Sequence, residues 1–118
     1  MLATPKTWAG DPTGYWKREA EAGRAPPEEW WNNLRSEQGT PCCDVADGIR
    51  VDDVDWDTKQ DEKGDTHYRV YLKGQWYVVP DNAVVHDPNR FGPAVVWPLT
   101  YPSTGYIYIR CFLPGAGT

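Results

Sequence analysis

Apolar residues recur at helical spacing near the start of the chain. Asp11 and Pro12 predict a helix start, because aspartate caps the free N–H groups of a first turn and proline is tolerated there. Trp16 and Ala20, four residues apart, mark the stripe that such a helix would bury. We expect this helix to continue to about residue 22, where a glycine follows.

A second helix is expected after the Pro26-Pro27 pair. Trp30, Trp31 and Leu34 would supply its apolar face, and Gly39 would end it. Both helices are short, and nothing later in the chain has a helical period.

From Ile49 onward apolar and polar residues alternate, which is typical of strands. The apolar face changes sides at residues 52–53, which we interpret as a bulge. Residues 68–72 and 76–79 form the clearest hairpin, because Lys73-Gly74 stands between them. A short strand over 94–97 is expected to be cut by Pro98, and a final strand over 106–113 to bury its odd-numbered side chains.

These elements predict an α+β fold. Two short N-terminal helices would pack on a small, strongly bent, mainly antiparallel sheet or partly open barrel of about five strands. Residues 1–12 are expected to form an extended arm, and residues 13–118 a single domain.

Composition explains how so short a chain could close a core. It has 118 residues, with 7 Trp and 7 Tyr against only 2 Phe. Each large ring can bury roughly 150–250 Å², so aromatic side chains can replace missing aliphatic ones. We assign five tryptophans to the core: Trp16, Trp30, Trp31, Trp56 and Trp76. No apolar run is long enough for a membrane span.

Charge is unevenly placed and limits the classes of partner. The net charge is −5, and residues 44–65 carry nine acids against three bases. Nucleic acid is an unfavourable partner, since no window clusters Lys and Arg. Asp53, Asp55 and Asp57 alternate as in a calcium loop, but Thr58 replaces the required glycine. We interpret them as a solvated strand face, with a loose cation site as the alternative.

The three cysteines are an odd number. Adjacent cysteines bridge each other only in a strained ring, so a disulfide would join Cys42 or Cys43 to Cys111. Fully reduced, buried thiols are the alternative. The first residues lack the basic start and apolar stretch of a signal peptide, so either a signal was removed or the chain matures with free thiols.

Motifs of catalysis are not evident, and no catalytic residue, metal or cofactor is assigned. Cys42, Cys43, His67 and His86 lack the spacing of a zinc site or of a thiolate–imidazole pair. The aromatic residues that the core does not need are the candidates for binding, because amphipathic rings supply contact area at little entropic cost. They are Trp8, Tyr15, Tyr101, Tyr106 and Tyr108.

The chain resembles small uncharacterised bacterial proteins that are usually exported. The resemblance covers roughly residues 30–115 and rests on Trp30-Trp31-x-x-Leu34, Gly39, Cys42-Cys43, Asp47, Tyr68-Arg69-Val70, Gly74-x-Trp76, Val79-Pro80-Asp81 and Arg110-Cys111-Phe112-x-Pro114-Gly115. It implies a compact domain clamped by cysteines and supplies no catalytic residues. Those proteins often carry a further cysteine where this chain has Gly48.

We therefore expect a non-enzymatic structural or interaction subunit of a larger assembly, such as a virus particle or a multiprotein complex. It would dock on a protein partner through the N-terminal arm and a tyrosine-bearing sheet face, and self-association into a homo-oligomer is compatible with this. The alternative is a secreted or periplasmic module that binds sugar or cell-wall material.

Overall fold

The computed structural model describes residues 14–42 and 48–116. Two helices, α1 (Tyr15–Glu21) and α2 (Glu28–Asn32), precede six strands, and two 3-10 turns, η2 (Asp53–Asp55) and η3 (Asp81–Ala83), lie between strands. The strands are β1 (Ile49–Val51), β2 (Trp56–Gln60), β3 (Thr66–Leu72), β4 (Gln75–Val78), β5 (Ala94–Thr100) and β6 (Ile107–Leu113).

The strands form two separate three-stranded antiparallel sheets, in the orders β1-β5-β6 and β2-β3-β4. The prediction of one bent sheet or partly open barrel of about five strands is therefore wrong. The two sheets separate between Val51 and Trp56, where the chain makes the η2 turn instead of the predicted bulge. This turn carries the chain out of one sheet and into the other. Among the described residues no strand joins the two sheets into a closed barrel.

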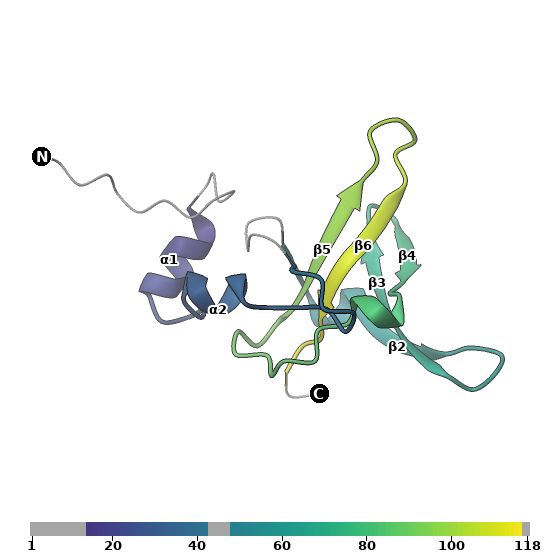
Figure 1. The fold of residues 1–118 in the computed structure, drawn as a ribbon, viewed down its shortest axis with the longest axis horizontal. Coiled ribbons are helices and arrows are strands. Elements are labelled where there is room, and N and C mark those ends of the chain that lie inside the picture. Colours follow the sequence, from purple (N-terminus) through teal and green to yellow (C-terminus); the bar gives the residue numbers. More distant parts are fainter. Residues whose placement is uncertain (1–13, 43–47, 117–118) are drawn as a thin grey trace, which may run out of the picture.

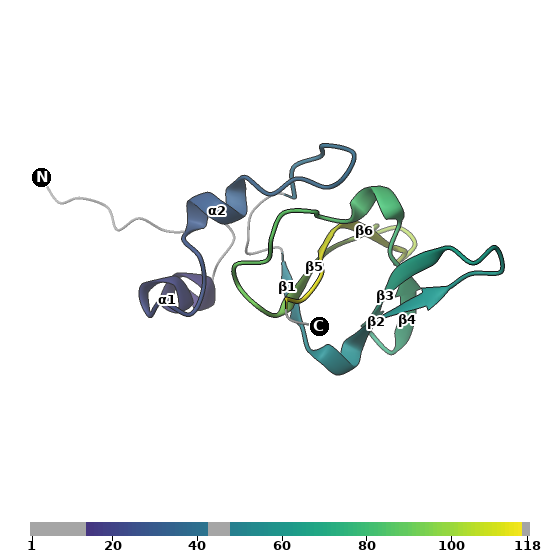
Figure 2. The same cartoon turned by 90° about the horizontal axis from the view of Figure 1, so that it is seen from below.

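The β1-β5-β6 sheet is the middle layer of the fold. Figure 2 shows the helices on one side of it and the β2-β3-β4 sheet on the other. One cluster of buried side chains joins the helices to the middle sheet: Trp16, Trp31, Leu34, Cys42, Val85, Val95, Trp97, Cys111 and Leu113. A second cluster joins the two sheets: Val51, Val70, Val79, Ala83, Val84, Ala94, Val96, Ile109 and Phe112. The small α+β domain thus has two aromatic-rich cores.

Trp31 is the centre of the first core and is fully buried. Its ring contacts those of Trp16, Trp30 and Phe91 at centroid distances of 4.9, 4.8 and 5.4 Å. Its indole N–H donates to the carbonyl oxygen of Pro26 at 3.0 Å, so the one polar atom of the ring is satisfied. The assignment of Trp16 and Trp31 to the core is confirmed.

The second helix is much shorter than predicted. It ends at Asn32 rather than near Gly39, because the Asn33 side chain donates to the carbonyl oxygen of Glu29 at 2.9 Å and closes the last turn. The chain then extends, and Leu34 enters the first core. The start predicted for the first helix, at residues 11–12, lies outside the described residues.

The predicted strands agree more closely with the structure than the predicted helices do. The β3–β4 hairpin is confirmed, and both residues of its turn, Lys73 and Gly74, have positive φ values of 48° and 85°. Positive φ at both central residues is what the type I′ two-residue hairpin turn requires. Pro98 does not end β5, since the strand continues to Thr100 after a register shift at 97/98. No described helix is long and apolar enough to cross a membrane.

Candidate functional site

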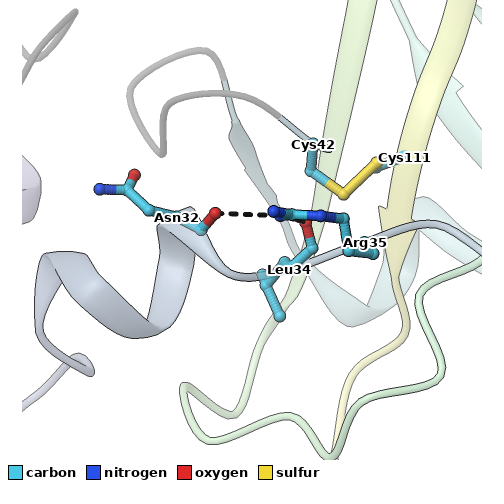
Figure 3. Close-up of a disulfide and its surroundings, with 5 residues drawn as sticks. All are labelled: Asn32, Leu34, Arg35, Cys42 and Cys111. Carbon is cyan, nitrogen blue, oxygen red and sulfur yellow. Dashed lines mark hydrogen bonds between the residues drawn. A yellow bond between two sulfur atoms is a disulfide. The ribbon is translucent and has the colours of Figure 1, made fainter. Parts of the chain in front are cut away.

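A disulfide joins Cys42 to Cys111 and fixes the segment after α2 to β6 (Figure 3). The two Cα atoms are 5.6 Å apart, and both cysteines are buried. The neighbouring Arg35 guanidinium donates to the carbonyl oxygens of Asn32 at 3.1 Å and Leu34 at 3.0 Å, which holds the turn beside the bridge. The sequence left open whether Cys42 or Cys43 pairs with Cys111, and the structure pairs Cys42. Cys43 lies outside the described residues.

The predicted interaction residues are not gathered in one place. Tyr101 and Tyr106 stack on each other at the end of the β5–β6 hairpin, with ring centroids 6.0 Å apart, and are 52% and 62% exposed. Figure 1 shows this hairpin projecting from the rest of the fold. Tyr108 is half-buried on β6, and Tyr15 packs edge-on against Trp16 in the first core. Trp8 lies outside the described residues.

A more extended aromatic surface lies on the β2-β3-β4 sheet, on the side turned away from the second core. We call it the outer face and define it by Asp57, Arg69, Tyr71, Trp76 and Val78. Strand register places Asp57 opposite Arg69, Arg69 opposite Val78, and Tyr71 opposite Trp76. Tyr71 and Trp76 are each 41% exposed and Val78 is 60% exposed. The rings of Tyr71 and Trp76 meet edge to face at 5.5 Å.

Arg69 organises the outer face. Its Nε and one terminal nitrogen donate to the two oxygens of Asp57 at 2.9 and 2.6 Å, which makes a bidentate ion pair. Its guanidinium carbon also lies 4.6 Å from the centre of the Trp76 ring, at cation–π distance. The hydrogen bonds from Arg69 lower the pKa of Asp57 below its ordinary value.

Assigning Trp76 to the core was wrong. Tyr68, Val70 and Leu72 alternate with polar residues on β3, and the two-residue turn places Trp76 beside Tyr71, on the opposite face from Val70. The register of the hairpin was thus the signal that could have found the outer face.

His67, at the start of β3, is held between two carboxylates. Its Nε2 lies 2.8 Å from Asp61 Oδ2, and its Nδ1 lies 2.8 Å from Asp81 Oδ1. Asp61 belongs to the β2–β3 connection, and Asp81 begins η3, so the imidazole joins two segments that are distant in the sequence. The hydrogen bond with Asp61, followed by that with Asp81, raises the pKa of His67.

The three alternating aspartates do not share a strand face, so that interpretation is wrong. Asp53 and Asp55 lie in η2, where Val54 turns outward and is 82% exposed, whereas Asp57 is paired with Arg69 on the outer face. Among the described residues there is no group of three or more His, Cys, Asp or Glu side chains that could hold a metal ion.

A cleft of about 530 Å³ opens beside η2, between the start of β2 and the segment that follows β6. The rings of Trp56 and Tyr68 form part of its wall, together with Asp53, Asp57, Thr58, Pro114 and Gly115. Its volume is within the range of small-molecule sites. This cleft was not predicted from the sequence, because Trp56 was assigned to the core alone.

Comparison with known protein families, with curated proteins and with solved structures finds no match to this chain.

Proposed function

We propose that the chain is a non-catalytic interaction domain that docks on a protein partner as a subunit of a larger assembly. The observation that supports this most directly is the composition of the outer face. Trp, Tyr and Arg are the residues most enriched among the dominant contacts of protein interfaces. Here Arg69 and Tyr71 lie on β3 and Trp76 lies on the neighbouring strand β4, with the two aromatic side chains each 41% exposed.

Preorganisation adds to this argument. A side chain that is already ordered loses little conformational entropy when a partner binds. Trp76 is flanked by Tyr71 and Arg69, and Arg69 is in turn held by Asp57. The outer face therefore presents a rigid aromatic surface rather than a set of mobile side chains.

The stacked tyrosines of the β5–β6 hairpin are a second contact region in this proposal. Tyr101 and Tyr106 are joined through the backbone as well as through their rings, since the Tyr101 N–H donates to the Tyr106 carbonyl oxygen at 2.9 Å. A hairpin end of this kind can enter a concave partner surface. In this proposal the two tyrosines therefore keep their predicted role as interaction residues.

The test places a photo-crosslinking amino acid at position 78, in the middle of the outer face, and in a separate protein at position 62 on the β2–β3 connection. Irradiation in the source cells is expected to give one dominant conjugate from position 78 only. With that partner purified, Trp76→Ala should weaken binding by roughly 30-fold or more, as for a central interface residue. Lys63→Ala should change affinity by less than about twofold.

The proposal fails if position 78 gives no conjugate that position 62 lacks. It also fails if Trp76→Ala, Tyr71→Ala and Tyr101→Ala all bind the purified partner as the unmodified protein does. Saturable binding of a glycan that these substitutions abolish would instead support the alternative of a sugar-binding module.

A further inference from the structure

The cleft beside η2 has rigid aromatic walls. The Trp56 ring packs against Phe112 at a centroid distance of 5.9 Å and against Tyr68 at 6.1 Å, and Tyr68 packs against Phe112 at 5.4 Å. Phe112 is fully buried, so this triangle of rings rests on the second core. The cleft is therefore formed before any ligand arrives.

The segment after β6 approaches the Trp56 ring closely. A Cβ atom at Gly115 would lie only 3.0 Å from Cζ2 of Trp56 and 3.4 Å from the backbone nitrogen of Ala94. Only glycine allows this approach without displacement of the ring. The Trp56 indole N–H also points to Oδ1 of Asp53, at 3.4 Å, which orients the ring toward η2.

The charge of the cleft has one sign. Asp53 and Asp57 are the charged residues of its described lining, and no basic residue accompanies them. Arg69 occupies both oxygens of Asp57. Asp53 has only the long contact with Trp56, and its second oxygen has no protein hydrogen-bond partner within the described residues. Arg50 lies in an adjoining hollow, 3.9 Å from Asp52.

We propose that this cleft binds an organic cation, namely an alkylammonium or quaternary ammonium group. Aromatic faces attract such a group through their quadrupoles, and a carboxylate beside them supplies the counter-charge. Trp56, Tyr68 and Asp53 provide this combination. An uncharged sugar would leave the negative charge of Asp53 without a counter-charge, and Thr58 is the one aliphatic hydroxyl in the described lining.

The same cationic group can come from a free small molecule or from a lysine side chain of a peptide. Choline and Nα-acetyl-lysine methylamide represent these two sources as probes. The cleft shares Asp57 with the outer face, but Trp76 does not line it, so variants at Trp76 should bind both probes normally.

The test follows the Trp56 indole N–H signal by two-dimensional NMR of the full chain, with the signal assigned from Trp56→Phe. At constant ionic strength, at least one of the two cations is expected to shift it saturably. The neutral isostere of choline, 3,3-dimethylbutan-1-ol, should bind about tenfold more weakly because it lacks the charge. Asp53→Asn should weaken binding of the cation by about fivefold or more, since the counter-charge is removed.

Asp55→Asn is the matched control. It removes the same charge from the same turn but from outside the cleft, and should alter affinity by less than about twofold. Equal binding of the neutral isostere, equal effects of the two asparagine substitutions, or the absence of a saturable shift with both cations would overturn the proposal. So would glucose, if it produced the saturable shift at lower concentration than either cation.

Discussion

Arg69 and Trp76 lie on adjacent strands with the guanidinium carbon of Arg69 4.6 Å from the ring centre of Trp76. The same guanidinium holds Asp57 on the strand at the opposite edge of the sheet. One side chain on the middle strand therefore connects both edges of the β2-β3-β4 sheet.

Replacing Arg69 by lysine should loosen this sheet although the charge is kept. A lysine ammonium cannot form the bidentate ion pair with Asp57 and at the same time stack on the Trp76 ring as a planar guanidinium does. We expect the melting temperature to fall by a few degrees and the Trp76 indole NMR signal to broaden. Lys59→Gln, on β2 and exposed, should change neither. Unchanged values for Arg69→Lys would contradict this account.

The bridge formed by His67 should make stability depend on pH. Its pKa is raised in the folded state, so its stabilising contribution is complete below the unfolded value of about 6.5 and is lost as the pH rises through the folded value. The hydrogen bond with His67 lowers the pKa of Asp61, whose contribution is complete above about 3.9 and is lost as the pH falls through the folded value. The bridge is therefore strongest between these limits.

Urea denaturation at pH 5.5 and pH 8.5 measures this effect. The unmodified protein should lose more stability between the two values than His67→Gln does. His86→Gln is the control, because His86 lies exposed in the connection between η3 and β5, and this variant should retain the full difference. If His67→Gln and the unmodified protein show the same pH dependence, the two carboxylates do not stabilise the charged imidazole.

Loss of the disulfide should cost a large part of the stability. The bridge spans a sequence separation of 69, and closing a loop of that length in the unfolded chain is worth roughly 4 kcal/mol. The double substitution Cys42→Ala and Cys111→Ala should lower the free energy of unfolding by about this amount. A reductant should destabilise the unmodified protein but leave the double variant unchanged. A loss below about 1 kcal/mol in the double variant would refute the estimate.

Gly48 is required by packing rather than by backbone conformation. A Cβ atom there would lie 2.9 Å from Cγ1 of Val95 and 3.0 Å from the Trp97 ring, both fully or almost fully buried. Gly48→Ala should destabilise the domain by about 1–3 kcal/mol, the usual cost of overpacking. Gly48→Cys, which adds a larger side chain at the same place, should cost at least as much. Thermal melting of both variants checks this, and an unchanged midpoint would show that Trp97 can move aside.

Local pattern was sufficient for the parts of the fold that local interactions determine. The Lys73-Gly74 turn predicted the β3–β4 hairpin. The alternation along residues 106–113 predicted a final strand, which the structure has at Ile107–Leu113. The division into two sheets could not be predicted in this way, since β1 pairs with β5, far along the chain, and not with β2. Such pairings are decided by tertiary packing, which overrides local preference.

The candidate sites were harder to predict from the sequence, for a related reason. Whether a tryptophan is core or surface depends on which face of its strand is covered, and this is known only once the layers are known. Trp76 and Trp56 were both assigned to the core, yet the first lies on an exposed face and the second lines a cleft beside the core.

The position of the disulfide also bears on how the domain would survive proteolysis. The five strands β1–β5 lie between Cys42 and Cys111. A single cut anywhere in this interval, for example in the exposed connection at residues 61–65, would leave two fragments that stay covalently linked. A nicked molecule would keep its mass, apart from one added water, until a reductant separated the pieces.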